Sequence, residues 1–483
     1  MAKLKNIIKQ LSADDYQTLY DNLMVSNAEK SATLLKFIRE KAMSDGKIME
    51  ELDVNTNAYY TLRSRLNQKI EEYLLQQIEN PRTDLLKKVA NVSEVVFTKK
   101  RAISVATLKK LEKELLDYDL ANELTVVYKN LKKLHINTPE SFQYSQLYNR
   151  HIAYMLALDK AEDLLAEYFK KYGSFTLTGS EIEKLELTLM YNEMVNVARL
   201  YQSHRLYVYM QCMAIFHRFF VETTEKPEDE PIEDILTAIE KIFETYNLDA
   251  IYFNLRTVFD FLKLVYYNQY KVYKKAEKYY EDVNEDSPML LTNYSLYTYP
   301  ALFLTMKLDR HLRLQSEDTL YEENKLLFDD YEADNNDVPK YMTYMCYRAL
   351  CCFYSKHYNE AEKTLFNLLN DVNLKKFPQA MIEAKLLLSL QYCMKGDLDL
   401  FNQSINSIQR TVRMLDDKSE HVTLLVKLMK TTLSEGKVGK EQKLRAIIDK
   451  LRNIKVNRFS PIMHIRLDDE LIHRLTHDLV ISY

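Results

Sequence analysis

Apolar residues recur along this chain mainly at three- and four-residue spacings, which is the period of an amphipathic helix. Near the N-terminus one such series is formed by Leu4, Ile7, Ile8 and Leu11. The same periodicity continues almost to the C-terminus and is interrupted only by short polar breaks. We therefore expect an all-α protein.

The clearest pattern of a helical hairpin lies between Leu350 and Leu369. A helix rich in apolar residues is expected to end at Lys356-His357-Tyr358, and a second one opens with the small Ala361. Related patterns recur elsewhere, so we expect antiparallel hairpins stacked into a right-handed superhelix. Stacked hairpins form concave surfaces that bind other molecules and rarely carry chemistry.

Polar breaks divide the chain into three predicted segments. These are a small N-terminal helical unit at 1–80, a first helical-repeat segment at 81–224, and a second repeat segment with a C-terminal capping helix at 232–483. The strongest break is at 225–231, where two prolines stand among acidic residues. Such a sequence is typical of a solvated loop, so we place a boundary between two helical halves there.

Two smaller breaks also contain glycine. Asp45-Gly46 is expected to end a helix over 27–43, because glycine is a common helix stop. Two helices are expected over 139–155 and 158–172. Residues 171–174, which include Gly173, are expected to separate them from a later helix that begins after Ser180.

Composition supports long helices with short connections, since the 483 residues include only 6 glycines and 9 prolines. The net charge is −4, and both signs are interspersed. No window approaches 18 uncharged apolar residues, so we expect a cytoplasmic protein without a membrane segment. The five cysteines lie in apolar helical patterns and are expected to be reduced core residues: Cys212, Cys346, Cys351, Cys352 and Cys393.

Several stretches resemble the second helix of tetratricopeptide repeats, in which a small residue packs at the helix crossing. They are Tyr358-Asn359-Glu360-Ala361 with Leu365, Tyr273-Lys274-Lys275-Ala276 with Tyr280, Lys395-Gly396-Asp397-Leu398 with Ile405, and Leu158-Asp159-Lys160-Ala161 with Leu165. The spacing between matches is irregular, and the chain has no tryptophan. The resemblance implies a degenerate, tetratricopeptide-like superhelix. No peptide-carboxylate clamp is carried over, because no regular array of polar positions aligns.

A second resemblance concerns the first 80 residues. The stretches LKNIIKQLSADDYQTLYDNL and AYYTLRSRLNQKIEEYL are similar to the start of large helical proteins of Bacteroidota, for which no activity is established. This resemblance implies the same architecture and nothing about activity.

A helix-turn-helix is the sharpest alternative to a repeat-only protein. Lys47 to Leu52, a break at Asp53-Val54-Asn55 and a helix from Thr56 have its length and order. The candidate DNA contacts on the second helix are Asn57, Arg63 and Lys69. Against DNA binding, neighbouring glutamates dilute the positive charge, and the spacing suits any short hairpin. The alternative function is a cytoplasmic transcriptional regulator with a repeat sensor domain.

Lysines and tyrosines interleave between Tyr266 and Tyr280. Basic and aromatic residues together can clamp single-stranded nucleic acid. The tyrosines recur at helical steps, however, so we favour a buried stripe from which the lysines extend outward. Because tyrosine is enriched in binding hot spots, Tyr279 is our candidate contact for a partner.

Signatures of catalysis are missing. No glycine-rich phosphate loop and no nucleophile elbow occurs. His473 and His477 stand four residues apart and could share a metal, but no glutamate lies between them as in zinc proteases, and Leu471 and Leu475 predict a buried stripe. We expect no catalytic residue, no cofactor and no metal. The predicted function is a non-catalytic scaffold that binds a protein or peptide partner.

Overall fold

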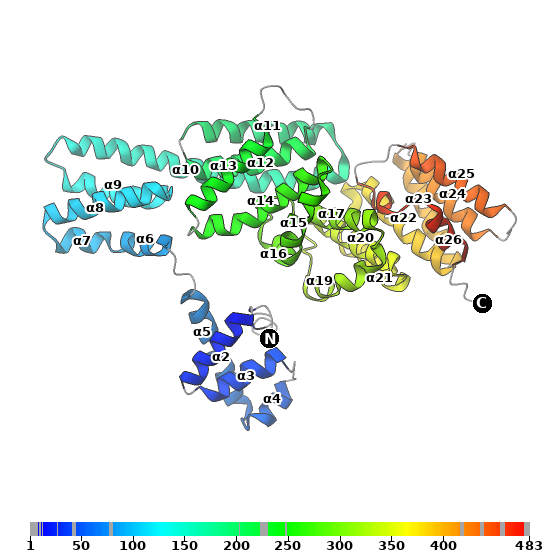
Figure 1. The fold of residues 1–483 in the computed structure, drawn as a ribbon, viewed down its shortest axis with the longest axis horizontal. Helices are drawn as coiled ribbons and strands as arrows, with labels where there is room; N and C mark the ends of the chain where they lie inside the picture. Colours follow the sequence, from blue (N-terminus) through cyan, green and yellow to red (C-terminus); the bar gives the residue numbers. More distant parts are fainter. Residues whose placement is uncertain are drawn as a thin grey trace. The chain divides into compact units, whose positions relative to one another are not determined.

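The computed structural model consists of helices and their connections, with no strand among the residues that it describes (Figure 1). This confirms the all-α fold class. The described residues are 8, 11, 13–26, 28–40, 45–76, 81–201, 203–222, 230–246, 249–415, 420–434, 439–454 and 459–477.

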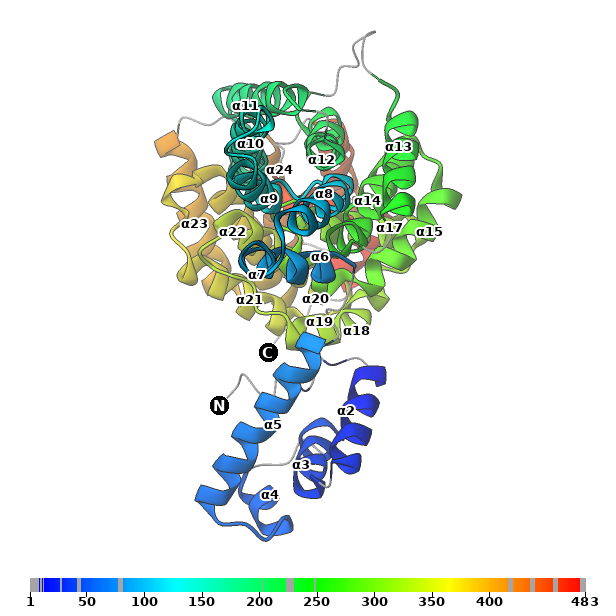
Figure 2. The ribbon, with the colours of Figure 1, turned by 90° about the vertical axis from the view of Figure 1, so that its left-hand side faces the viewer.

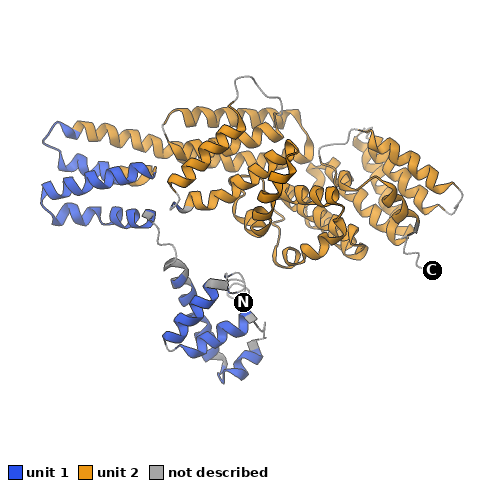
Figure 3. Cartoon of the chain, viewed as in Figure 1, with its two compact units in different colours: residues 1–118, 126–141, 248–250 blue, residues 119–125, 142–247, 251–483 orange. Residues whose placement is uncertain are grey.

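Contacts divide the chain into two compact units (Figure 3). The first unit contains residues 1–118, 126–141 and 248–250, and the second contains 119–125, 142–247 and 251–483. Of the loop predicted at 225–231, residues 225–229 lie outside the described part of the chain. Because both flanks of this loop belong to the second unit, a domain boundary there stays a prediction.

The early helices are short, apart from α5. Their bounds are α2 (Ala13–Val25), α3 (Glu29–Glu40), α4 (Asp45–Glu51), α5 (Thr56–Gln76), α6 (Pro81–Ala90), α7 (Val92–Thr98), α8 (Arg101–Asp117) and α9 (Ala121–Leu134). Helix α3 packs against both α2 and α5 (Figures 1 and 2). Buried residues between Ile8 and Tyr73 form one hydrophobic core.

The predicted stop at Asp45-Gly46 falls on the first two residues of α4, and the end of the preceding helix, between Glu40 and Asp45, lies outside the described residues. The reason for a helix at Gly46 lies in the apolar residues that follow: Ile48 and Leu52 are buried in the core of α2, α3 and α5. Their burial stabilises a helical turn around Gly46, where glycine alone would favour a helix end.

The later helices all lie at least partly in the second unit. Their bounds are α10 (Glu140–Thr178), α11 (Glu181–Arg199), α12 (His204–Phe220), α13 (Ile232–Thr245), α14 (Ala250–Gln269), α15 (Tyr273–Glu285), α16 (Ser287–Asn293), α17 (Ala301–Leu314), α18 (Leu320–Glu323), α19 (Lys325–Asp330), α20 (Val338–Tyr354), α21 (Tyr358–Asp371), α22 (Pro378–Lys395), α23 (Leu398–Leu415), α24 (Glu420–Leu433), α25 (Lys440–Arg452) and α26 (Asp469–His477). Three short 3-10 helices are η1 (Glu317–Thr319), η2 (Leu374–Lys376) and η3 (Pro461–His464).

Helix α10 is a single helix of 39 residues, so the predicted interruption at 171–174 is wrong. Gly173 lies inside it, and a Cβ atom there would stand 3.1 Å from both the Tyr299 ring and Pro339. This glycine therefore serves close packing between segments. The helix ends at Thr178, followed by Gly179 in the left-handed region.

Neighbouring helices in the sequence pack against one another in the second unit. Helix α21 lies against both α20 and α22, α22 lies against α23, and α24 lies against α25. The small residues Ala276 and Ala361 are buried, as the hairpin pattern predicts. All five cysteines are also free and buried, which confirms their prediction as core residues.

Three hairpins of the second unit share one turn geometry. Lys271, Lys356 and Gly396 each adopt a positive φ, of 58°, 61° and 70°. The amide N–H that follows each of them donates to a carbonyl five residues earlier, at 2.8, 2.8 and 3.0 Å. This is the Schellman arrangement at a helix C-terminus. The same local turn thus recurs at three of the positions that resemble tetratricopeptide repeats.

Candidate functional site

A pocket of about 340 Å³ lies among α10, α12, α17, α20 and the segment before α26. Its volume falls in the range of small ligand sites, which is roughly 300–1,000 Å³. The lining residues are Tyr172, Thr176, Phe219, Phe220, Tyr299, Leu302, Thr305, Leu308, Thr343, Cys346, Tyr347, Leu350, Phe459, Ser460, Pro461 and His464.

Aromatic rings dominate this lining. Tyr172 meets Tyr299 edge to face at 5.2 Å between ring centroids and lies 6.1 Å from Phe220. Edge-to-face contacts of this kind fix the orientation of the rings. The pocket therefore has rigid apolar walls.

Two phenols and one thiol of the pocket are held in neutral forms. Burial raises the pKa of the Tyr299 and Tyr347 phenols well above the usual tyrosine value. Burial likewise raises the pKa of the Cys346 thiol, so it carries no reactive thiolate at neutral pH. No lysine, arginine, aspartate or glutamate lines the pocket. A ligand group that fits this pocket would therefore be neutral and largely apolar.

Hydroxyl groups provide the polar contacts within these walls. The hydroxyls of Tyr299 and Tyr347 are fully buried; that of Tyr299 lies near Thr176 and Thr343, and that of Tyr347 lies near Asn324 and Cys351. Thr176, Thr305 and Thr343 each donate to a carbonyl of their own helix, which leaves their oxygens as acceptors. These three threonines are half-buried, so their hydroxyls are the polar groups that a ligand in the pocket could reach.

One wall of the pocket is a non-repeat segment of the chain, residues 459–465, which we call the inner segment. Its backbone is held by a side chain that is distant in sequence: the Tyr354 hydroxyl of α20 donates to the His464 carbonyl at 2.6 Å. The same hydroxyl accepts from the Arg466 amide at 3.1 Å. One side chain of α20 thus holds this part of the chain through two main-chain groups.

A buried polar cluster anchors the start of the inner segment. Ser460 Oγ donates to one Glu383 oxygen at 2.7 Å, and His421 Nε2 lies 2.5 Å from the other. Glu383 stands between the serine and the histidine, so the histidine does not reach the serine as a base would in a hydrolase triad. The cluster connects α22, α24 and the inner segment and has a structural role.

Two isoleucines of the inner segment fill a second apolar site. Ile462 and Ile465 are both buried and lie with Leu390, Leu425 and Met429 of α22 and α24. The sequence pattern did not single out residues 459–465, because their apolar spacing is short and has no helical period over several turns. Only their contacts with α17, α20 and α22 reveal the site.

The candidate DNA contacts lie on α5 in the first unit. The Asn57 side chain lies outside the described part of the structure. Arg63 is half-buried, with its guanidinium 6.0 Å from the Tyr59 ring centroid. Lys69 is exposed, and its Nζ lies 3.5 Å from Ser26 Oγ. Both charged side chains therefore already have contacts within the unit.

Tyr279, the candidate partner contact, lies on α15 and does not line the pocket. Its half-buried ring stacks on Tyr267 of α14 at 5.7 Å, with 7° between the ring planes. The Nζ atoms of Lys263 and Lys278 lie 5.1 and 5.8 Å from its ring centroid. Burial raises the pKa of its phenol.

The histidine pair at the C-terminus is only partly described. His473 is exposed on α26, whereas the His477 side chain lies outside the described residues. Leu471 and Leu475 are buried, which confirms the predicted apolar stripe. Among the described residues, no group of three or more histidine, cysteine, aspartate or glutamate side chains is arranged to hold a metal ion.

Comparisons with known proteins do not show a family for this chain. No family model matches it, and neither does any curated protein or solved structure. The likeness to tetratricopeptide repeats and to helical proteins of Bacteroidota therefore rests on the residues quoted above. In the described part of the chain, no helix has both the length and the apolar character needed to cross a membrane.

Proposed function

We propose that this protein is a non-catalytic scaffold that binds an extended segment of a protein partner. A neutral apolar side chain of that segment would enter the pocket among α10, α12, α17 and α20. The observation that carries this proposal is the inner segment, whose main chain is held by Tyr354 directly beside the pocket. The surroundings of the pocket thus already hold one polypeptide strand through its main chain.

The proposal includes a tetratricopeptide-like, right-handed superhelix of antiparallel hairpins. Three recurring Schellman turns and the packing of neighbouring helices support it. In this arrangement, the pocket would belong to the concave face, where such superhelices hold extended ligands. The localisation that we propose is the cytoplasm, in keeping with five free thiols.

A random peptide library displayed on phage and selected on the full-length protein tests this function. We expect enriched peptides with a shared apolar position, and we expect Leu302→Arg to weaken their binding at least about tenfold, because the change places a charge in a neutral pocket. The matched control is Leu326→Arg on α19, where the side chain is 78% exposed. Circular dichroism verifies that both variants fold.

Two results would contradict the proposal. One is a selection that enriches no sequence. The other is a set of peptides that bind Leu302→Arg and the unchanged protein equally well, which would place their site elsewhere.

The alternative function, a transcriptional regulator, has one specific observation in its favour. Helix α4, a turn at residues 52–55 and α5 follow the order of a helix-turn-helix. Lys30 Nζ donates to the Leu52 carbonyl at 3.2 Å, and Asn55 caps α5 through Ala58 N–H at 2.9 Å, so the turn is well supported. Retention on duplex DNA that is lost in Arg63→Ala and Lys69→Ala would favour this alternative.

A further inference from the structure

A second surface, independent of the pocket, surrounds the turn between α14 and α15. Tyr270 and Tyr273 flank the turn and are 50% and 40% exposed. The lysines around them are also exposed: Lys271, Lys274, Lys275 and Lys278. We call these six residues, with Arg313 of α17, the basic aromatic surface.

This surface only partly agrees with the buried stripe that the sequence predicts. Tyr280 is buried and the lysines extend outward, as expected. Tyr270 and Tyr273 are not buried, however, because they lie at the end of the hairpin, beyond the helices that cover Tyr280. Part of each ring is therefore exposed to solvent.

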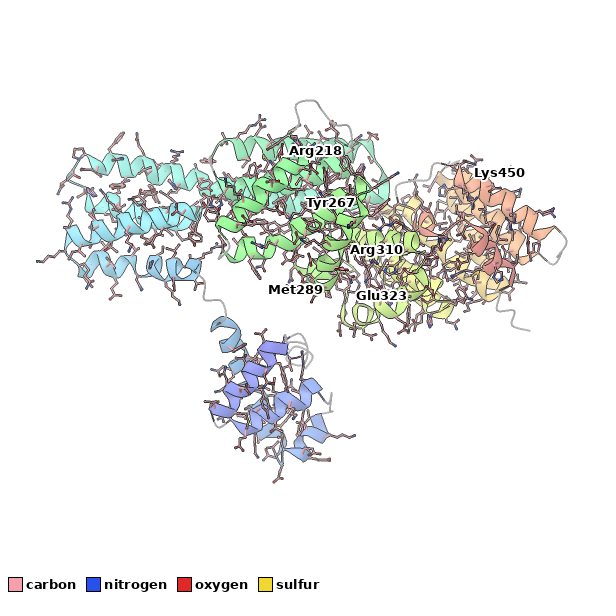
Figure 4. All side chains as sticks on the ribbon, in the orientation of Figure 1. Arg218, Tyr267, Met289, Arg310, Glu323 and Lys450 are labelled. Carbon is pink, nitrogen blue, oxygen red and sulfur yellow. The ribbon has the colours of Figure 1, made fainter. Side chains whose placement is uncertain are left out.

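Helix α17 adds cations that sequence spacing could not reveal. The Arg313 guanidinium lies 3.8 Å from the Tyr273 ring centroid, and the Arg310 guanidinium lies 4.1 Å from that of Tyr280. Figure 4 labels Arg310 and Tyr267, which come from two of the three helices that build this region. A flat guanidinium on an aromatic ring holds that ring in place.

Lysines of the surface share α15 with four acidic residues, Glu277, Glu281, Asp282 and Glu285, and differ from neighbouring cations in making no ion pair among the described residues. Arg310 pairs with Glu277, and Lys263 pairs with Glu240 and Asp260. The lysines of the basic aromatic surface and Arg313 form no ion pair with any described carboxylate. Five cations thus remain to attract an anionic partner.

The aromatic rings next to the turn pack against one another. Tyr267 and Tyr279 stack in parallel, and Lys275 Nζ lies 5.1 Å from the Tyr267 centroid. The ring centroids of Tyr266 and Tyr270 are also 4.9 Å apart, so the exposed Tyr270 ring packs against that of Tyr266. Tyr270 and Tyr273 therefore extend from a packed aromatic base.

We propose that the basic aromatic surface binds single-stranded nucleic acid without sequence preference. The lysines and Arg313 would contact phosphates, and bases would stack on Tyr270 and Tyr273, since stacking on an aromatic ring tolerates any base. A membrane surface fits less well, because the exposed aliphatic side chains beside the rings are only Val272 and Leu314. An acidic polypeptide would use the cations and leave the rings without a role.

Fluorescence anisotropy of the full-length protein with labelled oligothymidylate of about 16 nucleotides tests this proposal. Contacts with roughly four phosphates predict that the logarithm of the affinity falls with the logarithm of salt with a slope of about −3. We expect Lys274→Glu with Lys275→Glu to lower the affinity at least about tenfold. We expect Tyr270→Ala with Tyr273→Ala to lower it about tenfold, because a stacked base contributes roughly 1–3 kcal/mol.

The matched control is Lys375→Glu with Lys376→Glu on η2, where both lysines are exposed and the net charge changes by the same amount. This control should keep the affinity of the unchanged protein. An equal loss in the control would show an effect of net charge and overturn the proposal.

Other outcomes would also overturn it. One is that polyglutamate binds through these lysines and the tyrosine changes have no effect on binding, which would assign the surface to an acidic protein. Another is the same result with phosphatidylserine vesicles, which would assign it to a membrane. If the variant Arg63→Ala with Lys69→Ala no longer bound the oligonucleotide while the surface variants still bound it, the binding site would lie on α5.

Discussion

At the scale of single residues, the pocket depends on positions where the size of the side chain matters more than its chemical character. Gly173 is the clearest case, because its missing side chain lets α10 approach Tyr299, which is a wall of the pocket. In the sequence this glycine is a helix breaker, and in the fold it lies inside a helix of 39 residues. The need for close packing overrides its low helix propensity.

Gly173→Val should therefore destabilise the second unit. The added carbons have no space beside Tyr299 and Pro339, and overpacking of this kind costs about 1–3 kcal/mol. Urea unfolding monitored by circular dichroism measures the loss. Gly46→Val on α4 is the matched control, because no atom lies within 4 Å of a Cβ there, and its effect should stay within about 0.5 kcal/mol. Similar losses in both variants would contradict this account of Gly173.

At the scale of elements, the recurring feature is the left-handed residue that ends a helix. Gly396 adopts this conformation without strain, whereas Lys271 and Lys356 adopt it with side chains. Glycine and lysine thus occupy equivalent places in three turns. The hydrogen bonds of the turn, not the residue type, are what the hairpins have in common.

Substitutions at these turns should have opposite signs. Lys356→Gly removes a strained side chain and should stabilise the second unit, while Gly396→Ala introduces one and should destabilise it, each by about 0.5–1 kcal/mol. Midpoints of urea unfolding measure both. If both changes shifted the midpoint in the same direction, the turns would not be equivalent.

At the scale of the whole molecule, the inner segment links residues that are far apart in the chain. Tyr354 bonds to His464 across 110 positions, and Glu383 bonds to Ser460 across 77. These contacts hold the inner segment in place as one wall of the pocket. The site is thus assembled by the tertiary structure and does not lie in any one hairpin.

Tyr354→Phe should loosen the inner segment, because it leaves the His464 carbonyl and the Arg466 amide without their partner. Such a loss costs roughly 1–3 kcal/mol in a buried site. Hydrogen exchange of residues 462–468 should become faster, while exchange in α14 stays unchanged. The control is Tyr321→Phe, whose hydroxyl meets Glu360 at the surface. Unchanged exchange in Tyr354→Phe would show that the apolar contacts of Ile462 and Ile465 suffice to hold the segment.

By itself, the sequence determined the all-α fold class, the burial of Ala276, Ala361 and the cysteines, and the helix–turn–helix order around Asp53. These are local properties, since helical period and residue size act within a few turns. The tertiary structure alone decided that α10 continues through Gly173, that the inner segment forms a wall of the pocket, and that Arg313 covers Tyr273. Each of these depends on atoms brought together from distant parts of the chain, and no periodicity in the sequence records such contacts.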